Sequence, residues 1–472
     1  MMLDATRWRA FAGALTVCSL LAWARTSSGQ IDDIGIGARV VLRNGVVPQA
    51  EDGTRVDVSK ARRLFRVDRT QNGWLWIVSE RVSGWVRPAD LVPIGRAMEY
   101  LTEEILSEPK SAWAYVLRGV LWEEMKEPDI ALAEYNEALQ IDPDDAEAHL
   151  RRGNLRKERK HDLKRALADY DEAIRLDPKV AAAYHERGQA LLAVGRYDDA
   201  VKDFTEAVKL DPKDVGSVHG RGIAHQLKGD LGRAIDDYNA AILLAPDDPV
   251  AHLNRGNAWC DQQDYDKAVA DYTEAIRLDK HYVLAYNNRG IVWRLKSEFD
   301  KAVSDHNVAV RLAPKDHTGY LLRGIAWKQL KEYDRALADY NGAIELEPRC
   351  AESLNGRAWI LATCPDANIR NGRISYDSAV RACSLTSWRA AHQLDTLAAA
   401  YAESRDFAHA AEWEGKALEM AQSEREKADF RARLQLYQEK KAYRDVPDVN
   451  VATIQPAPAE THSPAMATAS TR

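Results

Sequence analysis

The sequence lacks the features that mark most catalytic and nucleic-acid-binding proteins. Its 472 residues include five cysteines, none in a CxxC pair, which gives little support for a zinc site. No nucleophile–base motif and no phosphate-binding loop is present, so nothing favours an enzyme. No basic block accompanies the net charge of −7, which argues against nucleic acid as a partner. We therefore predict a binding protein with no catalytic residues, no metal and no cofactor.

Long apolar runs are also scarce, apart from one near the start of the chain. Residues 11–24 are apolar, follow Arg7 and Arg9, and precede small and polar residues up to Gln30. This order is typical of a secretory signal peptide, and the run is shorter than the ~20 residues that span a bilayer. We expect a signal peptide over residues 1–30, export to the periplasm or cell exterior, and no membrane span after processing. The alternative is an uncleaved membrane anchor.

What the chain does contain is a period of about 34 residues. An Arg-Gly pair recurs at intervals of 34 or 35 residues, with the glycine at Gly119, Gly153, Gly188, Gly222, Gly256, Gly290 and Gly324. Prolines recur in step at Pro109, Pro143, Pro178, Pro212, Pro246, Pro314 and Pro348. A period of this size indicates one supersecondary unit stacked many times. Such stacks build long surfaces, which favours binding over catalysis.

Each period reads as two amphipathic helices followed by a proline that stops the second. An alanine recurs in the second helix at Ala131, Ala166, Ala200, Ala234, Ala268, Ala302 and Ala336. Four residues later stands a ring, at Tyr135, Tyr170, Phe204, Tyr238, Tyr272, His306 and Tyr340. This pattern of small, aromatic and proline positions resembles the tetratricopeptide repeat (TPR) family. The resemblance implies a mainly α protein, a right-handed α-solenoid of about nine helical hairpins.

The resemblance covers residues 96–422. Seven close repeats run over about 112–349, an eighth begins at Cys350, and a ninth begins near Ala391. Residues 96–109 are predicted to be a lone second helix that joins the array to the preceding domain. Residues 423–443 are predicted to be a polar capping helix, and residues 444–472 are predicted to be a disordered tail.

The arginine before each glycine departs from the family pattern, in which leucine is usual. An acid stands sixteen or seventeen residues after seven of these arginines, at Glu134, Asp169, Asp203, Asp237, Asp271, Asp305 and Asp339. We hypothesise an Arg–acid pair within each hairpin. Arg357 is the exception, because the sequence places Ala382 opposite it.

Residues 31–95 have a different pattern, with short alternating strands separated by turns such as Asn72-Gly73. The Gly73-Trp74-Leu75-Trp76 and Gly84-Trp85-Val86 segments resemble bacterial SH3-like domains, which implies a small β-barrel. Domains of this kind bind peptides or peptidoglycan stems. The favoured interpretation is that Trp74, Trp76 and Trp85 fill the core, and the alternative is that they form a ligand surface.

The TPR resemblance also implies a ligand groove lined by first helices. The inner register positions lie two and three residues before each glycine and one after it. Our candidate groove residues are His185, His219, Asn254, Asn257, Asn287, Asn288, Leu321 and Ile325. Such a mixture suits an extended peptide or a partner helix, and the alternative is a solvated helix face.

Cys364 and Cys383 both fall in the lengthened eighth repeat. Either a disulfide within this repeat or two buried free thiols would fit the sequence.

The predicted function is an exported scaffold that binds a protein or peptide in its TPR groove. The first alternative is an envelope or cell-wall adaptor whose SH3-like domain contacts a peptidoglycan stem peptide. The second alternative is an accessory subunit of an extracytoplasmic enzyme complex.

Overall fold

The computed structural model describes residues 34, 36–58, 64–79, 82–158 and 162–445. The chain divides into two compact units, which we call unit 1 (Met1–Pro212) and unit 2 (Lys213–Arg472). Among the described residues, no helix has the length and apolar character needed to cross a membrane. The predicted signal peptide lies outside the described residues. Of the predicted tail, only the first two residues lie within them.

Unit 1 begins with a five-stranded antiparallel sheet in the order β4-β3-β2-β1-β5. The strands are β1 (Arg39–Leu42), β2 (Leu64–Gln71), β3 (Trp74–Val78), β4 (Ser83–Val86) and β5 (Leu91–Pro93). Asn72 and Gly73 close the β2–β3 turn with φ angles of 50° and 80°. These positive angles are the reason that Asn-Gly suits a two-residue hairpin.

The helices follow directly after β5. Those of unit 1 are α2 (Ile94–Ser107), α3 (Ala112–Glu124), α4 (Pro128–Ile141), α5 (Ala146–Glu158), α6 (Leu163–Leu176), α7 (Ala181–Ala193) and α8 (Tyr197–Leu210). The lone helix expected over residues 96–109 is α2, which packs its buried Ala97 and Leu101 beside Val41 of β1. The sheet and the first repeat therefore share one apolar core.

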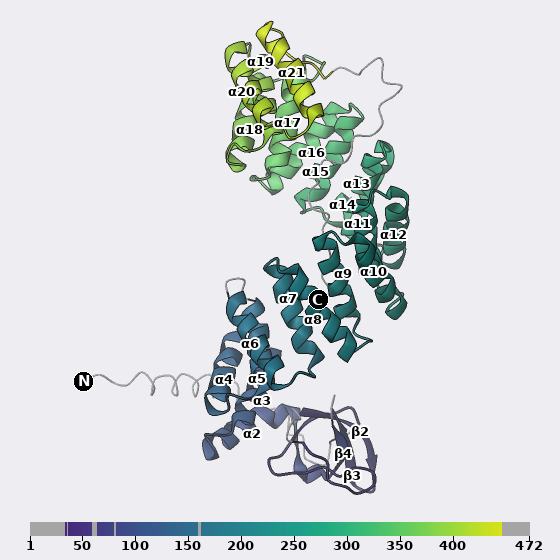
Figure 1. The fold of residues 1–472 in the computed structure, drawn as a ribbon, viewed down its shortest axis with the longest axis vertical. Coiled ribbons are helices and arrows are strands. Elements are labelled where there is room, and N and C mark those ends of the chain that lie inside the picture. Colours follow the sequence, from purple (N-terminus) through teal and green to yellow (C-terminus); the bar gives the residue numbers. More distant parts are fainter. Residues whose placement is uncertain (1–33, 35, 59–63, 80–81, 159–161, 446–472) are drawn as a thin grey trace, which may run out of the picture. The chain divides into compact units, whose positions relative to one another are not determined.

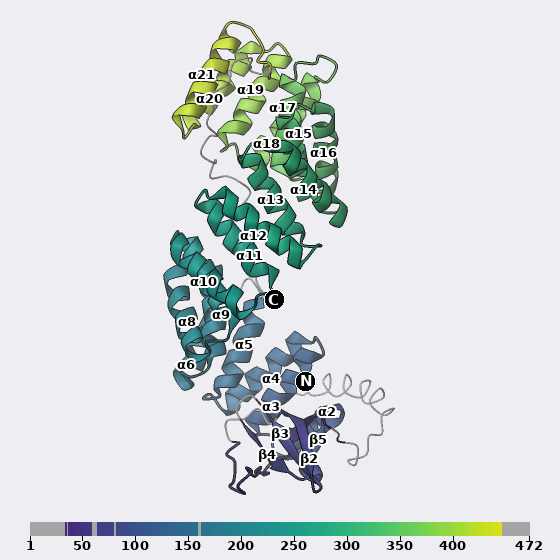
Figure 2. The same cartoon turned by 90° about the vertical axis from the view of Figure 1, so that its right-hand side faces the viewer.

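Unit 2 contains six further hairpins and a final helix (Figures 1 and 2). Its helices are α9 (Val215–Lys228), α10 (Leu231–Leu244), α11 (Pro249–Asp261), α12 (Tyr265–Leu278), α13 (Val283–Leu295), α14 (Phe299–Leu312), α15 (His317–Gln329), α16 (Tyr333–Leu346), α17 (Ala351–Thr363), α18 (Gly372–Leu385), α19 (Ala391–Glu403), α20 (Phe407–Met420) and α21 (Glu424–Gln438). Ser423 and Glu426 form a capping box at the start of α21. This helix covers α20 and buries Phe430 and Tyr437.

The recurring glycine gives the ring of the same hairpin room to pack. A Cβ atom on Gly256 would lie 2.7 Å from Cε1 of Tyr272, which is fully buried. Even alanine at this position would force the two helices apart, because side chains in a core are already at close-packed density. The glycine and the ring therefore pack against each other as a pair, and this pair recurs along the array.

His306 takes the place of the ring in the sixth repeat. It is 1% exposed, and a Cβ atom on Gly290 would lie 2.5 Å from its Cε1. Its Nδ1 lies 3.4 Å from Oδ1 of Asn287. Burial lowers the pKa of His306 to about 3, so the folded chain keeps this imidazole neutral.

The predicted Arg–acid pairs are present in all seven repeats. Arg255, for example, donates from Nε and Nη2 to the two carboxylate oxygens of Asp271, at 2.9 and 2.6 Å. Across the seven pairs the arginine side chains are 17–23% exposed and the acids 4–12%. Burial alone would raise the pKa of Asp271, but hydrogen bonds from Arg255 and His252 bring it below its usual value. In the eighth repeat, where the spacing placed Ala382 and no acid opposite Arg357, the arginine donates to Ser378.

Six of these seven arginines, all but Arg221, and also Arg357 donate in addition to a residue of the preceding helix, a contact that the spacing did not predict. Nη1 of Arg255 donates to Oδ1 of Asn239 in α10 at 2.6 Å. Equivalent bonds, each spanning sixteen residues, join Arg118 to Thr102, Arg152 to Asn136, Arg187 to Asp171, Arg289 to Thr273, Arg323 to Asn307 and Arg357 to Asn341. Each of these guanidinium groups therefore bridges a first helix, its own second helix and the second helix before it. We call this arrangement the arginine clamp.

Replacing Arg255 with alanine should lower the free energy of unfolding by ~3–5 kcal/mol, because the buried Asp271 carboxylate loses its bidentate partner. Urea unfolding followed by circular dichroism measures this loss. Arg277→Ala is the matched control, since Arg277 is 65% exposed and pairs with Glu274 on the surface. The control should change stability by at most ~1 kcal/mol. Equal effects of the two substitutions would contradict a stabilising role of the clamp.

Replacing His306 with tyrosine should weaken the acid sensitivity of the fold. Below about pH 6.5 His306 binds a proton in the unfolded chain, whereas it stays neutral when buried in the folded chain. The free energy of unfolding therefore falls with decreasing pH. The buried histidine contributes a slope of up to ~1.4 kcal/mol per pH unit between about pH 6.5 and its folded-state pKa of about 3. Tyrosine restores the ring found in other repeats and removes this contribution.

Urea unfolding at a series of pH values measures this slope. The control is His281→Tyr, whose wild-type side chain is 84% exposed and should give the wild-type slope. An unchanged slope in the His306 variant would show that this histidine does not drive the acid sensitivity.

Candidate functional site: an acidic pocket in unit 1

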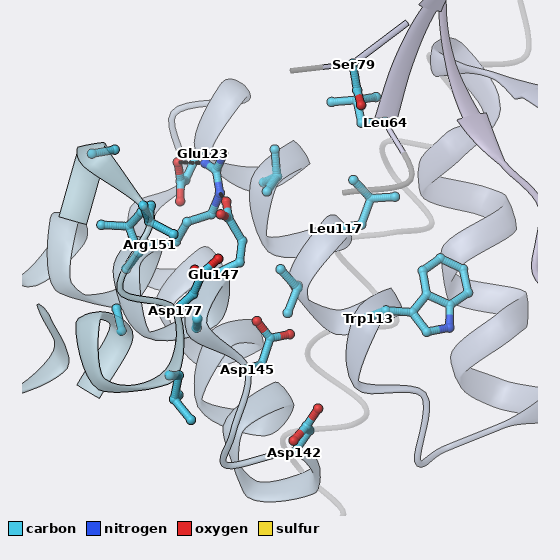
Figure 3. Close-up of a pocket in the computed structure, with 18 of the residues that line it drawn as sticks. Leu64, Ser79, Trp113, Leu117, Glu123, Asp142, Asp145, Glu147, Arg151 and Asp177 are labelled. Carbon is cyan, nitrogen blue, oxygen red and sulfur yellow. Dashed lines mark hydrogen bonds and ion pairs between the residues drawn. The ribbon is translucent and has the colours of Figure 1, made fainter. Parts of the chain in front are cut away.

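A pocket of about 800 Å³ lies between the sheet and the first helices of unit 1. Arg39 of β1, Leu64 of β2 and Ser79 after β3 line one part of it, and the helices α3 and α5 provide half of the remaining lining residues. Figure 3 shows Leu64 and Ser79 on this side, with Trp113 and Leu117 below them. The turns before α5 and α7 complete it. A pocket of this size lies in the range of specific ligand sites.

One part of the pocket lining is apolar. Val116, Leu117 and Val120 of α3 and Leu150 of α5 are 3–9% exposed and lie at the pocket wall with Trp113. Val116, Leu117 and Val120 flank Gly119 in α3. Because Gly119 has no side chain, α3 and α4 pack close together. The helical packing thus determines where these apolar side chains lie.

Acidic groups dominate the rest of the lining. Seven acidic side chains and three basic ones face the pocket: Glu123, Glu124, Asp142, Asp144, Asp145, Glu147 and Asp177 against Arg39, Arg151 and Lys179. Two of the three cations are held by acids. Arg151 lies between Glu123 at 3.2 Å and Glu147 at 2.6 Å (Figure 3). Arg39 pairs with Glu124 at 2.5 Å. The Arg39–Glu124 pair also ties β1 to α3.

The other acids lie in the turns between repeats. Asp142 accepts a hydrogen bond from the amide of Asp144, and Asp145 accepts one from the amide of Ala148 at 2.9 Å. Burial raises the pKa of the Asp145 carboxyl above its ordinary value. Asp144 is 77% exposed and pairs with Arg175 at 3.3 Å. The acidic rim therefore offers carboxylate oxygens to a cationic group that enters the pocket.

Most of the groove residues predicted in unit 2 are not accessible to a ligand. Five of them are only 0–4% exposed: His219, Asn254, Asn257, Asn287 and Asn288. Four of them bond in pairs across neighbouring repeats: Asn254 Nδ2 lies 2.7 Å from His219 Nε2, and Asn288 donates to Asn257 at 2.9 Å. Asn287 instead contacts His306 of its own hairpin. The prediction of an open groove at these five positions is therefore corrected, because their side chains are buried in the helix packing.

The remaining three groove candidates differ in their surroundings. His185 of α7 is partly exposed, its Nε2 lying 2.7 Å from Nε2 of Gln189 and its ring edge-on to Phe204. Leu321 is 6% exposed and Ile325 is partly buried, and both pack in the cluster around Tyr340. His185 retains the accessibility that a binding role requires, whereas Leu321 is mainly a packing residue.

The tryptophans of the sheet do not fill its core, contrary to the favoured interpretation. Trp74, Trp76 and Trp85 are partly exposed, while their neighbours Leu75 and Val86 point to the buried face. Trp76 and Trp85 meet edge to face at 5.1 Å. The Arg69 guanidinium carbon lies 4.6 Å and 5.2 Å from their ring centroids. Strand alternation explains the arrangement, because Trp74 and Trp76 alternate along β3 with Leu75 and Ile77, which face the core.

Cys364 and Cys383 are free thiols in the structure, so the disulfide is not formed. Cys364 packs beside Tyr340 at the end of α17, and Cys383 packs in a different cluster with Leu394. Burial raises the pKa of Cys383 to about 12. Among the described residues, no group of three or more His, Cys, Asp or Glu is arranged to hold a metal ion.

The sequence contained a signal for the pocket that our prediction did not use. The inner register positions that pointed to unit 2 fall on Val116, Leu117 and Val120 in the first repeat and on Leu150 and Arg151 in the second. Applying the same rule to these two repeats would have found the helical wall. The Asp-Pro turns between repeats supply the acidic rim. Arg39 and Ser79 line the pocket because the sheet packs against α3, and the repeat pattern does not predict that contact.

Comparisons with known proteins agree with the repeat pattern. A family model described as tetratricopeptide repeat matches residues 155–215 and 185–249, and one described as TPR repeat matches residues 129–158 and 256–296. No curated protein is similar enough to this chain to count as a match.

Several solved structures resemble parts of the chain. The protein YrrB, described as a TPR protein with an unusual peptide-binding site, is 23% identical over 40% of this chain and 96% of its own, with a TM-score of 0.37. Yeast Tom70 is 16% identical over 73% of this chain and 85% of its own, with a TM-score of 0.45. A tetratricopeptide repeat protein from Parabacteroides merdae is 16% identical over 53% of this chain and 94% of its own, with a TM-score of 0.43.

The period, the hairpins and the two family models agree over the middle of the chain. The protein therefore carries tetratricopeptide repeats, which form a TPR-type helical solenoid. A small antiparallel sheet precedes the solenoid in the sequence.

Proposed function

We propose that the protein is an interaction scaffold that binds a peptide segment of a partner protein in the acidic pocket of unit 1. The pocket itself is the observation that carries this proposal, since it combines an apolar wall with a net negative rim in about 800 Å³. Stacked repeats of this type support protein–protein interaction.

The lining indicates which segment fits. Apolar side chains of the partner would pack on Leu117, Val120 and Leu150, which removes apolar surface from water on both sides. Lysine or arginine side chains would meet the carboxylates of Asp142 and Asp144 at the rim. A segment with both kinds of residue is therefore the best complement.

The tryptophan face of the sheet favours the adaptor alternative as a second function. If the sheet is an SH3-like domain, its exposed Trp76 and Trp85, with Arg69 against them, offer a stacking surface for a peptide or a peptidoglycan stem. The five short antiparallel strands and the single apolar core support this assignment.

Export is part of the proposal and rests on the sequence of residues 1–30. A basic start, an apolar run and small polar residues favour delivery to the periplasm or cell exterior. There the scaffold would bring its partner to the envelope or serve as the accessory subunit of an enzyme complex.

Reversing the charge of the pocket rim should abolish binding of cationic peptides. We expect a random peptide library panned against the full chain to enrich sequences that contain Lys or Arg beside apolar residues. Asp142→Lys combined with Asp144→Lys should weaken the enriched peptides at least tenfold, because both substituted residues line the pocket. Fluorescence anisotropy measures the dissociation constants.

The matched control is Glu108→Lys combined with Glu206→Lys. Both control residues lie in unit 1, outside the pocket lining, and the pair changes the net charge by the same amount. The control should bind like the wild type. A library that enriches no cationic sequence, or a rim variant that binds as well as the control, would refute the proposed pocket function.

A further inference from the structure

The segment that follows α21 folds back onto unit 2. Lys440 has a φ of 56°, which ends the helix, and Tyr443, Arg444 and Asp445 then run to the end of α17. We call Tyr443–Asp445 the return segment. It lies some eighty residues along the chain from the helix it contacts.

The return segment makes backbone contacts of the kind made by a bound peptide. The amide of Asp445 donates to the carbonyl of Thr363 at 2.9 Å, and the hydroxyl of Tyr333 donates to the carbonyl of Asp445 at 3.1 Å. Arg444 donates to the carbonyl of Ala362 at 3.1 Å. Thr363 and Ala362 lie in the last turn of α17, where carbonyl groups have no partner within the helix.

Each side chain of the return segment also contacts its own residues of unit 2. We call these residues, together with the end of α17, the receptor surface. The ring of Tyr443 lies 5.8 Å from that of Trp359 and 5.4 Å from the Arg433 guanidinium. Arg444 pairs with Glu403 at 2.6 Å, and Asp445 pairs with Lys331 at 2.7 Å. An aromatic, a cationic and an anionic residue in consecutive positions are thus recognised separately.

The receptor surface uses the same register position as the pocket of unit 1. Trp359 is one residue after Ala358, which takes the place of the recurring glycine, just as Val120 is one residue after Gly119. Val120 lines the open pocket, whereas Trp359 contacts Tyr443. An inner position that lines an open pocket in one repeat is therefore covered by the chain itself in another.

The receptor surface has partners of its own that do not depend on the return segment. Glu403 also pairs with Arg370 at 3.1 Å, and Arg370 donates to the carbonyls of Cys364 and Pro365. Arg433 is held by Asp395 at 2.7 Å. Glu403 and Arg433 therefore keep an ion pair when the return segment leaves.

We propose that the surface formed by the end of α17, Glu403, Lys331 and Tyr333 is a second peptide-binding site, specific for a Tyr-Arg-Asp sequence, which the chain's own return segment occupies. Peptide recognition here uses backbone hydrogen bonds for affinity and the three side chains for specificity. A ligand of the same sequence binds only when the return segment leaves, so the site is closed in the intact chain.

The test compares two full-length proteins, the wild type and a variant that carries Tyr443→Ala, Arg444→Ala and Asp445→Ala. A fluorescent peptide of residues 440–445, Lys-Lys-Ala-Tyr-Arg-Asp, is titrated into each, and anisotropy gives the dissociation constant. If the return segment fills its site more than ~90% of the time, the peptide should bind the variant at least tenfold more tightly than the wild type. Circular dichroism melts verify that the variant is folded, and Arg444→Ala alone serves as a milder second variant.

Two controls make the outcome decisive. A peptide of the same composition with Tyr443 and Asp445 exchanged should bind the variant at least tenfold more weakly, and Glu403→Gln in the variant background should weaken the original peptide. Tighter binding to the variant together with both losses supports the proposal. Equal binding to the two proteins, binding to neither, or equal binding of the exchanged peptide would overturn it.

Discussion

The arginine clamp is the interaction on which the rest of this structure depends. One guanidinium group holds the two helices of its own repeat through a carboxylate and holds the preceding repeat through a polar side chain sixteen residues earlier. A planar group with five donors in fixed directions can serve both partners at once, which a lysine could not do. Its repetition from Arg118 to Arg357 links helices within each unit in chain order. Because the contact is largely buried, it stabilises the register of the stack as well as the single hairpin.

A scaffold made this way leaves the inner register positions free to differ. In unit 2 they carry asparagine and histidine residues that bond to each other, and near the end of the array Trp359 contacts the return segment. In the first two repeats the same positions carry valine and leucine, and the sheet and the Asp-Pro turns extend the surface into a pocket. The differences between repeats, and not the repeated residues, therefore determine where a ligand can bind.

The period and the register sufficed to predict the helices and the pairing of seven arginines with an acid sixteen or seventeen residues later. These features are local to one hairpin, so their spacing alone brings them together. The backward bond to residues such as Asn239 was missed because it joins two repeats. The burial of Asn254 and Asn257 was missed because a polar residue on an inner position looks the same in sequence whether it meets water or another amide.

Strand alternation placed Trp74 and Trp76 on one face but gave no sign that this face was the exposed one. The pocket needed the docking of the sheet on α3, through Arg39 and Glu124, which lie 85 residues apart.

The most direct test of this account is a double-mutant cycle on the backward bond, using Arg323→Ala, Asn307→Ala and the double substitution. Arg323 donates to Asn307 of the preceding repeat at 2.8 Å. If the clamp joins repeats, urea unfolding should give a coupling free energy of ~1 kcal/mol or more between the two substitutions. Losses that add to within ~0.3 kcal/mol would contradict the account, because the arginine would then stabilise only its own hairpin.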